Sequence, residues 1–286
     1  MEVKDRIAVV TGGASGIGRA LSLALADHGA AAVVVSDTDE PGAAKVTAEI
    51  TGRGHASLAV AADVSSEPAV RALIARVDQE FGRIDLFFSN AGIIVAGGIE
   101  VPDEAWSRIW AINVQSHIYV ARSVLPGMLA KGGGYLMVTA SAAGLLSQLG
   151  SAPYAVTKHA AVAFAEWLSI TYGDRGISVS CLCPQAVTTN LGATSMREVG
   201  GLVPPPQDSG AVPSAAGAGS VSRQASVDGV LSPDQVAASV LAAVADGRFL
   251  ILPHPEVATY ERRRAEDRDR WLNGMRRLHA RLAGRG

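Results

Sequence analysis

Short apolar runs alternate with helix-like patterns along most of this chain, and this alternation limits the possible folds more than any other feature. Seven apolar runs can be counted: RIAVVT, AAVVVSD, SLAVAAD, IDLFFSN, YLMVTAS, ISVSCLC and RFLILP. Continuous apolar strands separated by helices are typical of a parallel sheet with helices on both faces. The sequence therefore predicts an α/β fold with a doubly wound, seven-stranded parallel sheet of the Rossmann type.

Two regions depart from the alternation. Residues 191–232 are rich in Gly, Pro, Ser and Ala, and a loop this long in a compact domain is usually a lid, a binding loop or disordered. We expect a single Rossmann-type domain over residues 1–254, with a lid or substrate loop at about 191–232. Residues 255–286 form a charged extension, expected to dock as a helix on the body or on a neighbouring subunit. Its apolar stripe at helical spacing consists of Trp271, Met275, Leu278 and Leu282.

Composition argues against several classes of protein. The formal net charge of the 286 residues is −2, without the basic footprint of a nucleic-acid-binding protein. No apolar stretch approaches the ~20 residues of a membrane span, and the first residues do not resemble a signal peptide. Cys181 and Cys183 are expected to be core residues in a reducing compartment, and the histidines do not cluster as metal ligands do. We expect a cytoplasmic protein with a small-molecule partner, no metal, and no nucleic-acid or membrane partner.

A glycine-rich turn, TGGASGIG, joins the first expected strand to the first expected helix. Gly12, Gly16 and Gly18 would let the backbone approach a pyrophosphate at the helix N-terminus. The second strand ends at Asp37, where a carboxylate can bind the adenosine ribose and repel a 2′-phosphate. No Arg or Lys stands at positions 13–15 or at Thr38 to hold such a phosphate. The sequence therefore predicts NAD in preference to NADP.

Tyr154 and Lys158 stand four residues apart, on one face of an expected helix and one turn from each other. A nearby ammonium favours the phenolate, as does the positive charge of an oxidised nicotinamide. We therefore expect the tyrosine pKa to lie below its ordinary value of about 10. A tyrosine tuned in this way would serve as an acid–base group where a hydride is also transferred.

Five motifs in order make the chain resemble the short-chain dehydrogenase/reductase family. TGGASGIG matches the family's TGxxxGxG, and SNAG carries its NAG motif at the end of the fourth strand. The other three carry the family's tetrad, which here is Asn113, Ser141, Tyr154 and Lys158. The resemblance covers about residues 4–190 and resumes at the seventh strand. It implies a nicotinamide-dependent dehydrogenase that forms a homotetramer or homodimer.

The resemblance also implies roles for the matched residues. Tyr154 would exchange a proton with the substrate oxygen, and Lys158 would bind the nicotinamide ribose and favour the tyrosinate. Ser141 would orient the substrate oxygen, and Asn113 would hold a water in a proton relay. Besides Tyr154 and Lys158, the implied cofactor-binding residues are Gly12, Ser15, Gly16, Ile17, Gly18, Asp37, Asp63, Val64, Asn90, Ala91, Gly92, Pro184, Gln185, Val187 and Thr189.

The expected substrate end departs from the family at one position. After the sixth strand the family has a Pro-Gly pair, where this chain has Pro184 and Gln185, while Thr189 fits the usual threonine. Gln185 is either a substrate contact or a tolerated loop residue. The candidate substrate residues are Ser141, Leu145, Tyr154 and Gln185. The candidate apolar wall consists of Ile93, Ile94, Val95, Ala142, Leu145, Leu146 and Leu149.

These residues favour an NAD(H)-dependent oxidoreductase that transfers a hydride between nicotinamide and a medium-sized, mainly apolar secondary alcohol or ketone. A catalytically silent dinucleotide-binding regulator is an alternative, although it would not need Ser141, Tyr154 and Lys158 together. An imine or enoyl reductase on the same scaffold is another. The intact serine–tyrosine pair points to carbonyl chemistry instead.

Overall fold

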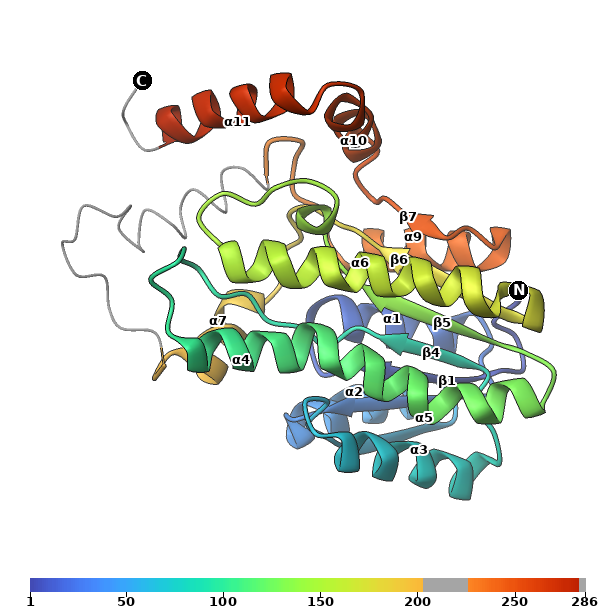
Figure 1. The fold of residues 1–286 in the computed structure, drawn as a ribbon. Helices are drawn as coiled ribbons and strands as arrows, with labels where there is room; N and C mark the ends of the chain where they lie inside the picture. The colour runs from blue at the N-terminus through green and yellow to red at the C-terminus, as the bar shows by residue number, and fades with distance from the viewer. Residues whose placement is uncertain (203–225, 283–286) are drawn as a thin grey trace.

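Seven parallel strands form a single sheet in the order β3-β2-β1-β4-β5-β6-β7 (Figure 1), which confirms the predicted fold. The computed structural model describes residues 1–202 and 226–282. The strands are β1 (Ile7–Thr11), β2 (Ala32–Asp37), β3 (Ser57–Ala61), β4 (Leu86–Ser89), β5 (Gly134–Thr139), β6 (Ile177–Leu182) and β7 (Leu250–Ile251). The strand order reverses between β1 and β4, and ligands of open α/β sheets bind at such a point. β7 is shorter than the apolar run predicted, since Pro253 cannot donate to a sheet ladder.

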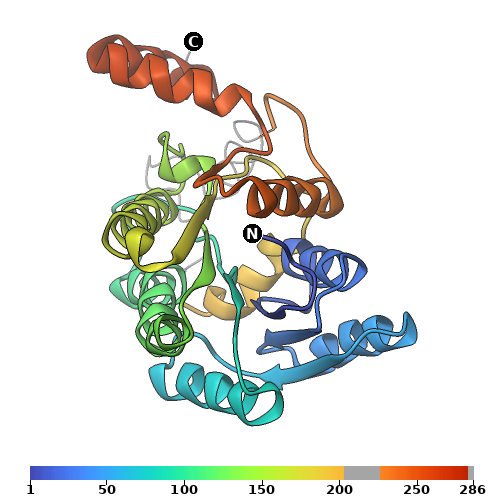
Figure 2. The ribbon, with the colours of Figure 1, turned by 90° about the vertical axis from the view of Figure 1, so that its right-hand side faces the viewer.

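Helices cover both faces of the sheet, as Figure 2 shows in an end-on view. One apolar core lies between the sheet and α1 (Gly16–Asp27), α2 (Glu40–Gly52) and α9 (Pro233–Asp246). The other lies against α3 (Glu67–Phe81), α4 (Asp103–Trp110), α5 (Ser116–Ala130) and α6 (Ala152–Tyr172). Strands buried on both sides explain the continuous apolar runs in the sequence.

Local signals fix where several of these helices begin. Asp39 caps α2 by accepting a hydrogen bond from the Gly42 N–H at 3.0 Å. Ser232 and Gln235 form a capping box at the start of α9. Between α4 and α5, residues Ala111–Gln115 (η1) form a π-helical turn, a feature that is frequent at functional sites.

The expectation of a loop over residues 191–232 is wrong for its first part. Leu191–Val199 form a helix, α7, because Ser195 and Val199 turn inward at helical spacing and are buried. A lid at residues 203–225 lies outside the described residues. Residues 226–231 are described and are joined to the body by a short bridge between Val187 and Leu231.

The charged extension forms two helices rather than one, α10 (Glu256–Glu266) and α11 (Arg268–Leu282). The break comes at Asp267, which is extended and whose carboxylate accepts a hydrogen bond from the Arg270 N–H at 2.9 Å. Val257 is fully buried and Trp271 packs against the same core, so the extension is docked on the body of its own chain. Across the described ranges, no helix has both the length and the hydropathy that crossing a membrane requires.

Candidate active site

A cleft of about 960 Å³ lies over the carboxyl ends of the strands, at the point where the strand order reverses. Every residue predicted to bind cofactor lines it, from Gly12 to Thr189. Of the predicted catalytic residues, Ser141, Tyr154 and Lys158 line the cleft, and Asn113 is fully buried behind it. The topology thus brings together the residues that the sequence motifs singled out.

The glycine-rich turn between β1 and α1 requires glycine at Gly12 and Gly18. Gly12 has a φ of +65°, which side-chain-bearing residues rarely adopt. A Cβ at Gly18 would stand 2.1 Å from the Gly12 carbonyl oxygen. Ser15 precedes α1 without capping it through its side chain, which leaves the first N–H groups of the helix for a ligand. This cradle fits the pyrophosphate of a dinucleotide.

Asp37 is held at the end of β2 by the backbone around the turn. Its carboxylate accepts hydrogen bonds from the Ala14 N–H at 3.0 Å and the Asp39 N–H at 3.1 Å. The side chain lines the cleft on the β2 side, where an adenosine ribose would lie. The carboxylate is therefore fixed in place and is not a freely moving strand end.

Arg108 is a cleft residue that the sequence analysis missed. Its guanidinium pairs with Asp63 at 3.4 Å and with Glu198 of α7 at 2.5 Å, and it donates to the Ser65 hydroxyl at 2.7 Å. Burial disfavours the charged form of Asp63, but hydrogen bonds from Ser65 and the charge of Arg108 outweigh it and lower the Asp63 pKa. The pairing connects α7 to the expected adenine side of the cleft.

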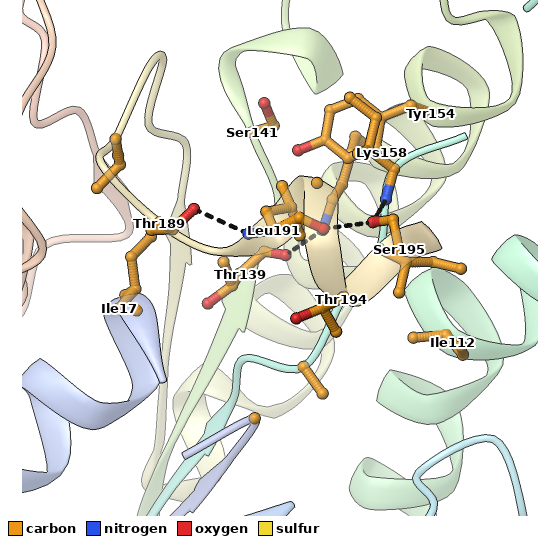
Figure 3. A pocket seen from close by; sticks show the side chains of 18 of the residues that line it. Ile17, Ile112, Thr139, Ser141, Tyr154, Lys158, Thr189, Leu191, Thr194 and Ser195 are labelled. Carbon is orange, nitrogen blue, oxygen red and sulfur yellow. Dashed lines mark hydrogen bonds between the residues drawn. The ribbon is translucent and has the colours of Figure 1, made fainter. Parts of the chain in front are cut away.

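Tyr154 and Lys158, the predicted acid–base pair, are both buried. Figure 3 shows the Ser141 side chain beside the Tyr154 phenol, with Lys158 on the same helix. The Lys158 ammonium donates to the Thr139 carbonyl at 2.8 Å and lies 5.7 Å from the centre of the Tyr154 ring. Figure 3 also shows Thr139 below them, at the end of β5.

The sequence predicts a lowered pKa for Tyr154, and this prediction is wrong because the chain's own groups raise it. Burial raises the pKa of Tyr154, although Ser141 beside it acts in the opposite direction. Burial also lowers the pKa of Lys158 to about 8, although the two nearby cysteines act to raise it. The chain's own groups therefore keep the phenol protonated at neutral pH, which is the form that can give a proton to a ketone oxygen.

Asn113 lies in the π-helical turn and clamps the segment after the NAG motif. Its side-chain oxygen accepts from the Ile93 N–H, and its amide donates to the Ile93 carbonyl, each at 2.9 Å. The amide also lies 3.3 Å from the Thr157 hydroxyl of α6. The side chain thus joins two walls of the cleft, whereas its implied part in a proton relay stays a prediction.

His117 lies one helical turn after Asn113 and is fully buried. Its Nδ1 is 2.6 Å from the Ser89 hydroxyl, and its Nε2 has no partner among the described residues. Burial, with a smaller contribution from the charge of Lys158, lowers the pKa of His117 to about 3. The folded protein therefore holds this histidine neutral at all ordinary pH values.

His117 should make the protein sensitive to acid. In the unfolded chain histidine binds a proton near pH 6.5, but in the folded chain it does not until about pH 3. The unfolded state thus takes up more protons, and the free energy of unfolding should fall by about 2 kcal/mol between pH 6.5 and pH 5. Urea titrations of the wild type and of His117→Asn measure this, because the variant lacks the contribution. Parallel pH profiles would refute the assignment.

The expected apolar wall is correct in part. Ile93, Ile94, Val95, Ala142 and Leu146 line the cleft. Leu145 and Leu149 are absent from the lining that the described residues form, and the part of Leu145 in substrate binding stays a prediction. The 3-10 turn η2 (Ala142–Gly144) rotates the chain so that the Leu145 side chain enters the core.

α7 supplies lining residues that the sequence did not indicate. Leu191, Ser195, Met196 and Val199 all face the cleft. The Ser195 hydroxyl accepts from the Ile94 N–H at 2.9 Å, so α7 is attached to the opposite wall (Figure 3). Gln185 lines the cleft, donates its backbone N–H to His254 at 3.2 Å, and has a buried side-chain oxygen without a partner in the described ranges. Within those ranges no cluster of three or more metal-ligating side chains is found.

A Rossmann sheet, a glycine cradle and a Ser–Tyr–Lys group in one cleft define a dinucleotide-dependent oxidoreductase that acts on hydroxyl or carbonyl groups. A family model described as short chain dehydrogenase matches residues 6–199. The chain belongs to the short-chain dehydrogenase/reductase family and is an NAD(P)-dependent enzyme of this class.

Relatives and solved structures agree with this assignment. The chain is 39% identical to 1-deoxy-11-beta-hydroxypentalenate dehydrogenase of Streptomyces exfoliatus, over 70% of this chain and 75% of the relative. It is 33% identical to 3beta-hydroxysteroid dehydrogenase of Mediterraneibacter gnavus, over 68% and 71%. A short-chain dehydrogenase/reductase from Burkholderia phymatum, solved in complex with NAD, is 30% identical, with a TM-score of 0.85 over 94% of this chain and 96% of that one.

Proposed function

We propose that the protein is an NAD(H)-dependent oxidoreductase of medium-sized, mainly apolar secondary alcohols and ketones. The observation that carries this proposal is a cleft in which apolar side chains line the same cavity as Ser141 and Tyr154. Ile94, Val95 and Leu146 belong to this wall. Two relatives whose names describe hydroxylated substrates, a hydroxypentalenate and a hydroxysteroid, support the proposed class.

The residues divide the chemistry between them. When bound, the nicotinamide would exchange a hydride with the substrate carbon. Tyr154 would give a proton to the carbonyl oxygen in reduction, or take it from the hydroxyl in oxidation. Ser141 would hold the same oxygen in line with the phenol. Lys158, fixed by the Thr139 carbonyl, would stand beside the phenol, where its charge favours the tyrosinate.

A screen of secondary alcohols and ketones, with NAD and NADP in parallel, tests the proposal. We expect turnover of alicyclic alcohols and ketones, followed by NADH absorbance. Binding of NADH, seen as enhanced fluorescence, without turnover of any substrate would instead favour a silent dinucleotide-binding regulator. Turnover confined to imines or enones would favour the third candidate, an imine or enoyl reductase.

Asp37 should set the preference for NAD. A carboxylate held at 3.0 Å from the Ala14 N–H would repel a 2′-phosphate, so Asp37→Ala should narrow the ratio of kcat/KM for NAD over NADP at least about tenfold. Asp39→Ala is the matched control, because Asp39 caps α2 and its removal should lower stability without changing cofactor choice. A wild type that works better with NADP would disprove this role of Asp37.

We also infer a homo-oligomer, a tetramer or dimer, built through α5 and α6. Trp167 is 53% exposed and Ile170 is 84% exposed on α6, and large apolar side chains of this kind are typical of association surfaces. Light scattering measures the mass.

Location in the cytoplasm stays a prediction.

A further inference from the structure

One arginine of the C-terminal extension contacts the catalytic domain through two directed bonds. The Arg264 guanidinium, on α10, donates to the Leu145 carbonyl at 2.5 Å. It also lies 3.4 Å from Nε2 of His159. Nδ1 of His159 is 2.8 Å from the Ala155 carbonyl, so the proton belongs on Nδ1 and Nε2 is free to accept from the arginine. Arg264 therefore joins α10 to the helix that carries Tyr154 and Lys158.

The Leu145 carbonyl lies in a segment that forms part of the cleft wall, so the bond from Arg264 acts on that wall. Leu145 belongs to the segment that runs from Ser141, at the end of β5, to Tyr154 on α6. The next residues of this segment, Leu146, Ser147 and Gln148, line the cleft. The segment forms no regular element between η2 and α6. Its Leu145 and Leu146 N–H groups bond to the Ala142 carbonyl, and its Leu145 carbonyl is bonded by Arg264 of α10.

Two other contacts join the C-terminal part of the chain to residues at or beside the cleft. One comes from Tyr260 in the extension, and the other comes from His254, which directly precedes the extension. The Tyr260 hydroxyl donates to Asp228 at 2.8 Å, and the neighbouring residues Ser226 and Val230 line the cleft. His254 accepts from the Gln185 N–H at 3.2 Å. Figures 1 and 2 show α10 and α11 beyond β7, which is the edge strand opposite to β3.

We propose that Arg264, in the C-terminal extension, is a positioning residue that fixes the cleft wall between Ser141 and Tyr154 from outside the cleft. The inference rests on the proposed function, because it concerns the substrate of that same site. A fixed wall selects substrates by their bulk. The carbonyl that Arg264 bonds belongs to Leu145, which is not among the predicted cofactor-binding residues, so Arg264 influences the fit of the substrate more than the affinity for the cofactor.

Three variants test this kinetically. Arg264→Met keeps the length and apolar stem of the side chain but removes its donors, and Arg264→Lys restores a donor. Arg262→Met, on an exposed neighbour, is the matched control. With a decalone as the bulky ketone and cyclohexanone as the small one, Arg264→Met should raise KM for the decalone about tenfold. In Arg264→Met, kcat and the Kd for NADH should stay within about twofold of the wild-type values. Arg264→Lys should have a KM for the decalone between those of Arg264→Met and the wild type. Arg262→Met should match the wild type in all three quantities. Equal KM values in Arg264→Met and wild type would overturn the proposal.

Hydrogen exchange provides a readout that does not need turnover. In the NADH-bound protein, amides of residues 142–153 should exchange faster in Arg264→Met than in the wild type or Arg262→Met. Amides of residues 268–282 should be unchanged, since Val257 and Trp271 keep the extension docked. Unchanged exchange in residues 142–153, or equal acceleration in both segments, would overturn the positioning role. If the wild type reduces no carbonyl compound, the proposed function fails, and this measurement still decides whether Arg264 fixes the wall.

Discussion

Replacing Tyr154 with phenylalanine should lower kcat at least about 100-fold while NADH still binds, because general acid–base catalysis contributes that much or more. The phenol is buried beside Ser141 and its pKa is raised, so it carries the proton that a ketone oxygen needs. Phenylalanine fills the same space and removes only that proton. Steady-state reduction of a ketone found in the screen measures kcat, and NADH fluorescence measures binding.

Tyr135→Phe is the matched control for this experiment. Tyr135 is also buried, but it lies in β5 and packs in the core on the other face of the sheet. Its variant should therefore keep kcat within about twofold of the wild type. Turnover near the wild-type value in Tyr154→Phe would remove the phenol from the mechanism.

The sequence alone located the candidate site residues that stand at the ends of strands. Asp37, Asn90 and Ser141 stand at or just after the ends of β2, β4 and β5, and parallel strands place their carboxyl ends at one edge of the sheet. That rule explains why the predicted cofactor-binding and catalytic residues lie in one cleft. The YxxxK spacing likewise fixed the relation between Tyr154 and Lys158, because helical geometry depends only on local sequence.

Other parts of the site depend on contacts between distant segments, which a single sequence does not reveal. Arg108 looks like any exposed helical charge until the fold brings it to Asp63 and to Glu198. Arg264 stands within a run of three arginines, and only the docked extension distinguishes it from Arg262. Ser195 is a short polar residue in a segment whose composition suggests a loop. Of the apolar stripe predicted for the extension, Trp271 packs against the core, and the break at Asp267 has no signal in the sequence pattern.

The pKa of Tyr154 shows a different limit of sequence reasoning. The four-residue spacing places the Lys158 ammonium near the Tyr154 phenol, and that charge by itself would lower the pKa of the phenol. The structure adds that both groups are buried, and the cost of burying a charge is the larger influence. The same burial moves Lys158 toward losing its proton near pH 8. Charge proximity can be read from sequence, whereas desolvation depends on the packing of the whole cleft.

Gly18→Ala should weaken NADH binding at least about 100-fold, which is the second large effect we expect. Gly18 lies in the first turn of α1, where helix propensity alone would favour alanine by about 1 kcal/mol. The new Cβ would stand 2.1 Å from the Gly12 carbonyl oxygen and 2.8 Å from the Asn90 amide nitrogen. The turn must open to admit it, which moves the N–H groups that would hold the pyrophosphate. Losing two hydrogen bonds to a charged group accounts for a change of this size.

Gly127→Ala separates this effect from helix propensity. Gly127 lies inside α5, and a Cβ there would meet no atom within 4 Å. That variant should be more stable by about 0.5–1 kcal/mol and should bind NADH like the wild type. Fluorescence titration gives the Kd, and thermal unfolding shows whether Gly18→Ala is still folded. A folded Gly18→Ala protein that binds NADH as tightly as Gly127→Ala would show that the close approach of Gly12 and Gly18 is not what forms the phosphate site. The glycine spacing would then reflect the packing of the turn alone.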